Sequence, residues 1–332
     1  MIDESFHIPV LTEEVIQHLL VKKNGDYLDA TSGFGGHSSA ILEQLVNGSL
    51  AATDQDPDAI GYLKSKFKSE ERLSIHHARF SELDKLFSTK KFDGILADIG
   101  VSSYQLDISK RGFSFMKDGP LDMRMNQNIG EDASSWLSNA SEKEISSVLW
   151  KYGEERKAKR IAKAIVEARK NLKIKSTKEL AEIILEEVPR KFNDKKHPAT
   201  KTFQAIRIFV NKEFSELIEG LINATQLIKA GGKIIVVSFH SIEDKIVKFF
   251  FTNYSKNKSK VSRYYPDLPK EKSLFENYKN KIIIPGEKEL KINSPSRSAK
   301  LRFATRNESD FFYPKEFKKK FMNYIDLENR YV

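Results

Sequence analysis

The residues of this chain whose types and spacing could do chemistry lie first at positions 29–38, Asp-Ala-Thr-Ser-Gly-Phe-Gly-Gly-His-Ser. Glycines let backbone N–H groups approach a ligand closely, and the first turn of a helix adds N–H groups that favour an anion. Asp54 follows Gly33 by about 20 residues, at the end of the next apolar run, where an acid suits the two hydroxyls of a ribose. The pattern favours a nucleoside site; an ordinary strand–helix turn is the alternative.

Strands and helices alternate around these residues. The apolar patterns predict strands ending at Ala30 and Asp54 and at 73–77 and 92–99, and helices over 12–21 (capped by Thr12), over 37–45 and from Pro57. Such alternation argues for an α/β fold with a parallel, doubly wound sheet, whose ligands bind beyond the carboxyl ends of the strands. Four candidate residues fall at those ends: Gly33, Asp54, Phe80 and Asp98.

The amino-acid composition and the apolar pattern change after the predicted fourth strand. Residues 107–127 predict a structured loop rich in Gly, Met, Asp and Arg, and a helical block follows to about residue 188, with helices at 134–137, 142–150, 154–170 and 177–187. This block predicts a helical domain inserted into the sheet domain. The remaining elements are expected as one helix over 202–229 closed by Ala230-Gly231-Gly232, a central strand at 233–239, a helix at 240–251 and a strand pair at 281–285 and 300–305.

Composition narrows the class of protein. The 332 residues include no cysteine, which excludes disulfides and fits a cytoplasmic protein. No signal peptide is apparent, and no apolar run approaches the length of a membrane span. His76 and His77 are adjacent, so on a strand they point to opposite faces, and no pair of histidines has metal-ligand spacing. We therefore expect no membrane and no metal.

The net charge of +10 is unevenly distributed. Residues 1–150 carry 15 basic and 23 acidic side chains, a net −8, whereas residues 151–207 (17 and 8) and 253–306 (14 and 5) each carry +9. Solvated lysines are one explanation. A surface for a polyanion is favoured, because aromatic residues are interleaved with basic ones, as in Arg263-Tyr264-Tyr265.

Longer motifs around these residues resemble those of a known protein family. Gly-Phe-Gly-Gly-His-Ser at 33–38 resembles the cofactor motif of the RsmH (MraW) family, and the resemblance extends over residues 6–306 in family order. The further segments are Asp-Ile-Gly-Val-Ser-Ser at 98–103, Arg-Gly-Phe-Ser-Phe at 111–115, Asp-Gly-Pro-Leu-Asp-Met-Arg-Met at 118–125, Tyr-Gly-Glu-Glu-Arg at 152–156, Ala-Lys-Arg-Ile-Ala at 158–162, His-Pro-Ala-Thr-Lys-Thr-Phe-Gln-Ala-Ile-Arg at 197–207 and Ser-Phe-His-Ser-Ile-Glu-Asp at 238–244.

The resemblance implies a class I (Rossmann-like) methyltransferase that uses S-adenosylmethionine to methylate the N4 amine of a cytidine in 16S rRNA of the small ribosomal subunit. It implies a discontinuous methyltransferase domain at 1–106 and 201–306 and a substrate-recognition domain at 107–200, and leaves the extension at 307–332 without a role. Tyr104 departs from the small residue or proline usual there. The implied cofactor contacts are Gly35, Gly36, His37, Asp54, Phe80, Asp98 and Gln105.

Several alternatives stay open. Asp98 is a candidate catalytic residue, an acceptor that orients the amine, or it only holds the cofactor. His240 and Glu243 are catalytic or merely begin a helix. The arginines at 111, 124 and 207 contact substrate or pair with acids, and Phe113, Phe115 and Met123 handle substrate or fill a core. A nicotinamide dehydrogenase and a non-catalytic RNA-binding assembly factor are the rival functions. The sequence does not indicate the oligomeric state or the target nucleotide.

Overall fold

The computed structural model describes residues 9–20, 22–190, 197–256 and 272–329. The chain divides into two compact units, Met1–Gly100 with Glu216–Met322 and Val101–Ser215 with Asn323–Val332. The insertion predicted at 107–200 falls inside the second unit. Each unit is described by itself.

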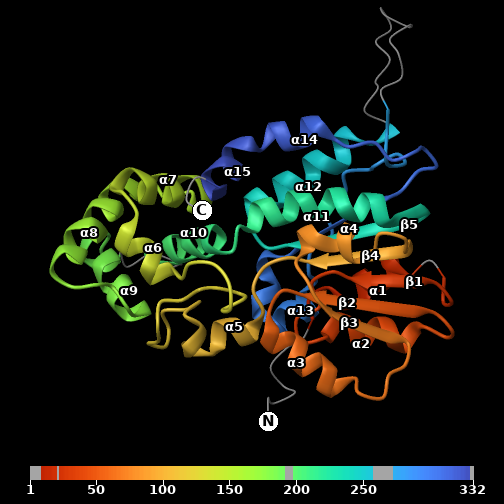
Figure 1. Ribbon diagram of the computed structural model, residues 1–332, viewed down its shortest axis with the longest axis horizontal. Coiled ribbons are helices and arrows are strands. Elements are labelled where there is room, and N and C mark those ends of the chain that lie inside the picture. The colour runs from red at the N-terminus through yellow and green to blue at the C-terminus, as the bar shows by residue number, and fades with distance from the viewer. Residues whose placement is uncertain (1–8, 21, 191–196, 257–271, 330–332) are drawn as a thin grey trace, which may run out of the picture. The chain divides into compact units, whose positions relative to one another are not determined.

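The first unit is built on a six-stranded sheet in the order β3-β2-β1-β4-β5-β6 (Figure 1). β1 to β5 are parallel and β6 is antiparallel to β5. The sheet confirms the predicted α/β fold, and the strand order reverses between β1 and β4, the switch point where such folds bind ligands. The strands are β1 (Asp26–Asp29), β2 (Ser49–Asp54), β3 (Leu73–His77), β4 (Phe92–Asp98), β5 (Ile228–Ser238) and β6 (Lys300–Thr305).

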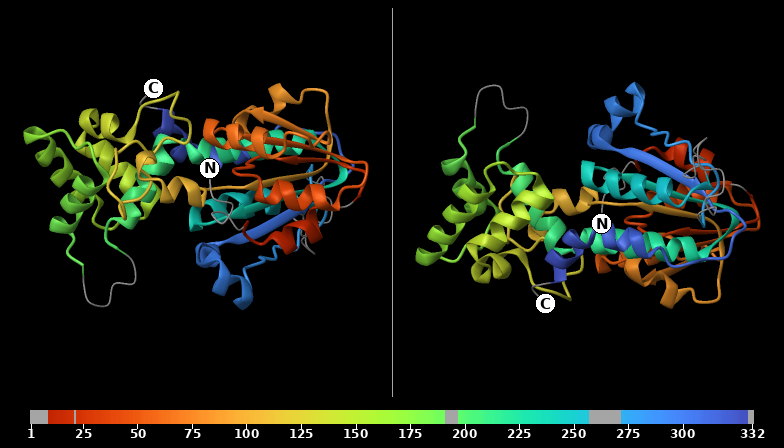
Figure 2. Two further views of the ribbon diagram at one scale, coloured as in Figure 1. Left: turned by 90° about the horizontal axis from the view of Figure 1, so that it is seen from below. Right: turned by 90° about the horizontal axis from the view of Figure 1, so that it is seen from above.

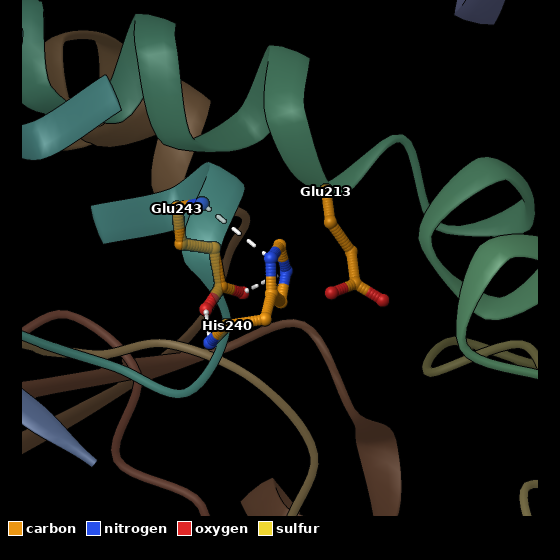
Figure 3. Close-up of side chains that lie close together, drawn as sticks. All are labelled: Glu213, His240 and Glu243. Atoms are coloured by element: carbon orange, nitrogen blue, oxygen red, sulfur yellow. Dashed lines mark hydrogen bonds and ion pairs between the residues drawn. The ribbon is translucent and has the colours of Figure 1, made fainter. Parts of the chain in front are cut away.

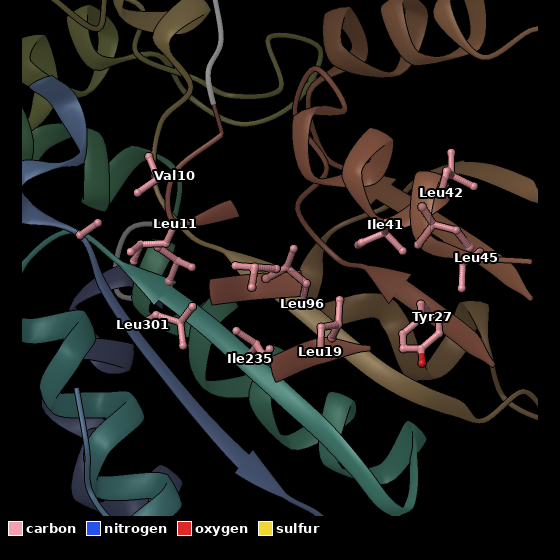
Figure 4. Close-up of a cluster of buried hydrophobic side chains, with 14 residues drawn as sticks. Val10, Leu11, Leu19, Tyr27, Ile41, Leu42, Leu45, Leu96, Ile235 and Leu301 are labelled. Carbon is pink, nitrogen blue, oxygen red and sulfur yellow. The ribbon is translucent and has the colours of Figure 1, made fainter. Parts of the chain in front are cut away.

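Helices cover both faces of this sheet (Figure 2). α1 (Thr12–Leu19) and α2 (Gly36–Gln44) pack on one face, against alternate side chains of the strands such as Tyr27, Leu96 and Ile235 (Figure 4). All three are fully buried, and burying a large apolar side chain contributes about 1.5–3 kcal/mol. α3 (Pro57–Lys66) lies on this same face. The opposite face is covered by α4 (Leu83–Leu86), α11 (Glu213–Leu227) and α12 (Ser241–Asn253). α13 (Glu287–Ile292) precedes β6 in the chain.

The second unit is helical. Its α7 packs on both α8 and α10, and capping boxes fix where α7 and α9 begin, because Ser141 and Ser176 each exchange hydrogen bonds with the glutamate three residues later. The helices are α5 (Ser103–Asp107), α6 (Ala133–Asn139), α7 (Glu142–Gly153), α8 (Ala158–Asn171), α9 (Thr177–Glu187) and α10 (Thr200–Val210).

The C-terminal extension forms two helices, α14 (Lys315–Lys320) and α15 (Met322–Asn329). In the first unit, Phe317 of α14 is buried and its ring stacks 6.3 Å from that of Phe249 on α12. In the second unit, Glu328 of α15 accepts hydrogen bonds from the backbone N–H groups of Phe214 (3.2 Å) and Ser215 (2.9 Å) at the start of α11. The extension is therefore an integral part of the fold.

The helix predicted over 202–229 is wrong, because it is two helices, α10 and α11. Lys212 between them adopts a left-handed conformation with φ 52°, which a continuous helix does not allow. Asn211 fixes the break, since its Nδ2 donates to the carbonyl of Met123 (2.7 Å) and its Oδ1 accepts from the N–H of Met125 (2.7 Å). These partners lie 86 or more residues away, beyond the reach of a local pattern.

Other local predictions are also corrected. Gly231 does not end a helix but lies inside β5. Thr12 is not the cap of α1: the N-cap is Leu11, in a left-handed conformation, and the Thr12 hydroxyl donates to the carbonyl of Pro9. Residues 281–285 form a single bridge, Ile283 to Leu301, whereas β6 pairs with β5. The helix predicted from 154 starts at Ala158. Arg263, Tyr264 and Tyr265 lie outside the described residues.

None of the helices in the described parts of the chain combines the length and apolar character that crossing a membrane requires.

Candidate functional site

The glycine turn between β1 and α2 is held in a conformation that glycine favours. Gly35 is the N-cap of α2 and has φ 76°, in the left-handed region. A Cβ at this position would lie 2.6 Å from Cδ2 of Leu63 and 2.8 Å from Cε2 of Phe67, so both side chains would have to shift to make room for it. The tight turn leaves the first N–H groups of α2 pointing out of the helix end, where they favour an anionic group.

Asp54 at the end of β2 is tied to this turn. Its Oδ2 accepts from the N–H of Gly33 at 2.7 Å and its Oδ1 accepts from the N–H of Asp56 at 2.8 Å. Burial raises the pKa of Asp54 to about 6, although both backbone hydrogen bonds act to lower it. The two hydrogen bonds orient the carboxylate, and each of its oxygens keeps a further lone pair for a ligand.

A buried cluster joins the ends of β1 and β4 to the start of α2. Ser38 Oγ donates to Asp29 Oδ2 at 2.6 Å, and His37 Nε2 lies 3.3 Å from Asp98 Oδ2. Burial would lower the pKa of His37, but its contact with Asp98 and the charges of Asp98 and Asp29 raise it. Burial raises the pKa of Asp29. The cluster thus places an imidazole between two carboxyl groups.

Besides His37 Nε2, whose contact is the 3.3 Å ion pair with Asp98, four buried polar atoms of this site have no hydrogen-bond partner among the described residues: Asp29 Oδ1, Thr31 Oγ1, His37 Nδ1 and Asp98 Oδ1. Most buried polar atoms in native proteins are hydrogen-bonded, so each exception requires an explanation. Asp29 and Asp98 are the last residues of β1 and β4, Thr31 follows β1, and His37 lies at the start of α2, where the sheet topology places a ligand. The atoms suit a ligand that carries both donors and acceptors.

Of the cofactor contacts predicted from the sequence, Phe80 and Gln105 differ from the others in their surroundings. The structure brings Gly35, Gly36, His37, Asp54 and Asp98 together at the carboxyl ends of β1, β2 and β4. Phe80 follows β3 but is only 6% exposed, and its ring lies so close to Gly220 of α11 that a Cβ there would be 2.2 Å away. Little of this ring is therefore available for stacking.

Gln105 belongs to the second unit. It forms a capping box with Ser102 at the start of α5: Ser102 N–H donates to Gln105 Oε1 at 3.1 Å, and Gln105 N–H donates to Ser102 Oγ at 3.2 Å. Gln105 is buried, so its position depends on this helix start. Tyr104 is the preceding residue of the same short helix, where the sequence departs from the family pattern.

The three arginines that sequence analysis singled out all have structural partners. Arg124 forms hydrogen bonds of 2.8 Å from Nε and Nη2 to Asp122, and Arg207 forms the same pair of contacts with Glu213. Arg111 donates to the carbonyls of Arg124 and Met125 at 3.1 and 2.8 Å. Of the three apolar candidates, Phe113 and Met123 are buried, while Phe115 contacts the ring of His197 at 4.5 Å.

His240 and Glu243 form the start of α12 (Figure 3). His240 Nδ1 accepts from the N–H of Glu243 at 3.4 Å, and Glu243 Oε2 accepts from the N–H groups of Phe239 and His240 at 2.9 and 3.2 Å. This capping box accounts for both residue types at that spacing.

Sequence reasoning missed two buried polar contacts. It gave Asp29 and Ser38 no role, although a buried acid at a strand end with a serine in the next helix turn was a usable signal. It also missed Glu328, whose partner Ser215 lies 113 residues away, and no local pattern could have indicated that contact.

Comparison with known proteins decides the family. The model of the MraW methylase family matches residues 4–307. The chain belongs to the MraW methylase family. This confirms the resemblance seen in the sequence, and it makes the protein an enzyme, a methylase. The match ends where the C-terminal extension begins, so α14 and α15 lie beyond the family's shared part.

Relatives of the methylase span nearly its whole length. A protein named ribosomal RNA small subunit methyltransferase H from Coxiella burnetii (strain CbuG_Q212) is 47% identical over 305 residues, 90% of this chain and 98% of that protein. One of the same name from Xanthomonas oryzae pv. oryzae (strain PXO99A) is 45% identical, covering 91% and 89%. A solved rRNA methylase from Streptococcus thermophilus has 10% identity, coverage of 93% and 99% and a TM-score of 0.39, too weak a likeness to say anything about the methylase.

Proposed function

We propose that this methylase transfers the methyl group of S-adenosylmethionine to the exocyclic N4 amine of a cytidine in 16S rRNA of the small ribosomal subunit. The observation that carries the proposal is the site in the first unit, where unpartnered buried polar atoms lie at the carboxyl ends of the strands beside the Asp54 carboxylate. Family membership and the names of the relatives supply the reaction and the substrate class.

The cofactor roles follow from the chemistry of each residue. Asp54 accepts hydrogen bonds from the ribose hydroxyls, because its carboxylate is already oriented by two backbone N–H groups. Gly35 and Gly36 let the backbone approach the methionine end, and the N–H groups at the start of α2 bind its carboxylate. His37 and Asp98 supply the remaining polar contacts. Phe80 flanks the adenine through the small part of its ring that stays accessible. Gln105 is kept as a cofactor contact on the family motif alone.

Methyl transfer needs the nitrogen lone pair aimed in line with the sulfonium methyl group. The N4 amine is conjugated with the cytosine ring and is a poor nucleophile. It loses a proton as the new N–C bond forms and the S–CH₃ bond breaks, which leaves S-adenosylhomocysteine. No strong base is required. Asp98 Oδ1, a buried acceptor at the end of β4, orients the amine and stabilises the positive charge that develops on it.

RNA recognition is assigned to the loop and helices at 107–200 and to the basic segments. Residues 151–207 and 253–306 each carry a net charge of +9, whereas residues 1–150 carry −8. In the second unit, Arg156, Lys157 and Lys159 are exposed and placed to contact phosphates. The whole small subunit is the better substrate than naked RNA, because folded RNA presents phosphates in a fixed arrangement.

A labelled-methyl assay tests the proposal. Purified protein, tritiated S-adenosylmethionine and small subunits from cells that lack this gene should give label in 16S rRNA, at one cytidine when the RNA is mapped. Asp54→Ala protein at the same cofactor concentration is the matched control and should transfer less. Absence of transfer with the unaltered protein would leave a non-catalytic RNA-binding role, and label on another base or at another atom would contradict the N4-cytidine assignment.

A further inference from the structure

The two tryptophans of the chain lie in the second unit in opposite environments. Trp136 on α6 is 3% exposed, and its Nε1 donates to Glu144 at 2.7 Å. Trp150, in the last turn of α7, is 60% exposed. A tryptophan buries about 150–250 Å² when it packs, so this indole leaves a large flat apolar surface in water.

Basic side chains gather at the same end of α7. The helix ends because Glu154 adopts a left-handed conformation (φ 49°), and the N–H of Glu155 bonds back to the carbonyl of Leu149 at 3.2 Å. This turn carries the exposed Arg156 and Lys157 past the end of the helix. Lys201 of α10 reaches the same place, since its Nζ donates to the Glu154 carbonyl at 3.0 Å.

We infer that Trp150 is a stacking platform for an unpaired base of the RNA substrate, with Arg156, Lys157 and Lys201 contacting the adjoining phosphates. An indole face accepts any base, and a cation beside it holds the negatively charged backbone that every base carries. This combination favours a single-stranded nucleic acid, in which a phosphate accompanies every exposed base. The inference rests on the proposed function and adds to it where, and by which contact, the RNA is held.

Two simpler explanations each account for only part of the arrangement. Cations near the C-terminal end of a helix complement its dipole, which explains Arg156, Lys157 and Lys201 but not the exposed indole. Single apolar side chains are often exposed, as Leu172 is at 69%, which explains the exposure but not the cations at the same end of the helix. Glu154 is the exposed acid of this turn, and its charge is outnumbered by the three cations.

Tryptophan fluorescence reads the contact directly. Titration of the full chain with a single-stranded RNA 12-mer should quench the emission of Trp150, because a stacked base quenches an indole. A Trp150→Phe variant retains only the buried Trp136, so the same titration should leave its emission unchanged. A double-stranded RNA of equal length should quench little, since its bases are already stacked on one another.

Affinity and its salt dependence separate stacking from charge. Trp150→Ala should weaken binding of the 12-mer about 5- to 150-fold, the equivalent of 1–3 kcal/mol, and leave the slope of log affinity against log salt unchanged. Arg156→Gln with Lys157→Gln should flatten that slope by about 0.7 for each phosphate that is no longer neutralised. Trp150→Phe should bind more tightly than Trp150→Ala. Leu172→Ala is the control, since Leu172 is also exposed in the same unit (69%, against 60% for Trp150), and it should bind like the unaltered protein.

The methylation assay and the binding assays separate an error in this inference from an error in the proposed function. If the unaltered protein methylates 16S rRNA but Trp150→Ala binds the 12-mer with unchanged affinity, or Trp150 emission is not quenched, the stacking platform is wrong and the reaction stands. If no RNA is methylated, the proposed function is wrong. A changed salt slope for Trp150→Ala would mean that the substitution disturbs the phosphate contacts instead, and would also overturn the stacking role.

Discussion

Asp54 in the first unit and Glu328 in the second are both carboxyl groups that burial holds at a raised pKa, about 6 and about 8. Their surroundings differ. Asp54 accepts from two backbone N–H groups, but at the same edge of the sheet Thr31 Oγ1 and His37 Nδ1 lack partners among the described residues. Around Glu328 the partners are complete, because it accepts from the N–H groups of Phe214 and Ser215 and from the Ser215 hydroxyl.

A buried, perturbed carboxyl group is therefore not in itself the mark of a binding site. At the start of α11 the protein satisfies its own helix N–H groups, which makes Glu328 a structural cap. At the ends of β1, β2 and β4 it leaves polar atoms for another molecule to satisfy. The difference predicts that removing Asp54 changes binding and that removing Glu328 changes stability.

Asp54→Ala should give the largest effect on binding. We expect S-adenosylmethionine to bind more weakly by about 1–3 kcal/mol, the range for losing a charged hydrogen-bond partner. Isothermal calorimetry measures this change. Glu71→Ala, an exposed acid of the same unit, is the control and should bind as the unaltered protein does. Equal affinity in Asp54→Ala and the control would remove the ribose role.

Glu328→Ala should give the converse result. The N–H groups of Phe214 and Ser215 would lose their buried acceptor, so the free energy of unfolding should fall by about 1–3 kcal/mol. Cofactor affinity should not change. Urea unfolding followed by circular dichroism measures the first quantity, and Asp326→Ala on the same helix is the control. A loss of cofactor affinity without a loss of stability would reverse the comparison.

The contrast also explains how much the sequence could predict. The placement of the glycine turn, Asp54 and Asp98 at one edge of the sheet was predictable, because the turn follows β1 and the two acids end β2 and β4 of a parallel sheet. Their roles in binding stay predictions. β2 and β3 have the predicted limits, since short apolar runs bounded by polar residues leave little choice. Local sequence patterns do not predict the features that depend on contacts between distant residues.

What the sequence did not indicate depends on distant partners. The break between α10 and α11 is held by Asn211 and the loop at 123–125, and the cap of α11 comes from Glu328, 113 or more residues along the chain. Helical periodicity continues across Lys212, because its left-handed φ changes the backbone and not the apolar pattern. Likewise, the burial of Phe80 results from Gly220, which no pattern near Phe80 predicts.

Asp98→Asn tests whether a second carboxylate of the site in the first unit acts in the reaction or only in cofactor binding. Asparagine keeps the size of the side chain but loses the charge that faces His37 and would stabilise the developing positive charge on the amine. We expect the methyl-transfer rate at saturating cofactor to fall more than tenfold, about 1.4 kcal/mol. Single-turnover kinetics measure it. A rate that is unchanged at saturation, with weaker cofactor binding alone, would leave Asp98 a cofactor-binding residue without a part in the chemistry.

The pH dependence of cofactor binding gives the smallest expected effect and tests the Asp54 site without a substitution. Only the ionised carboxylate accepts hydrogen bonds from both ribose hydroxyls, and a pKa of about 6 leaves roughly a tenth of it ionised at pH 5. The apparent Kd for S-adenosylmethionine should therefore be about tenfold higher at pH 5 than at pH 7.5.

Stability should change with pH in the opposite sense. A carboxyl group whose pKa is raised by folding favours the folded state most below its unfolded pKa, and that contribution is lost as the pH rises through about 6. Raising the pH from 5 to 7.5 should thus strengthen cofactor binding while the Asp54 contribution to stability without cofactor falls. Calorimetry and urea unfolding across this range measure the two quantities, with Asp54→Ala as the control that should lose both dependences. If binding in that variant keeps the same pH profile, the titrating group is not Asp54, and His37, whose pKa is also raised, becomes the residue to substitute next.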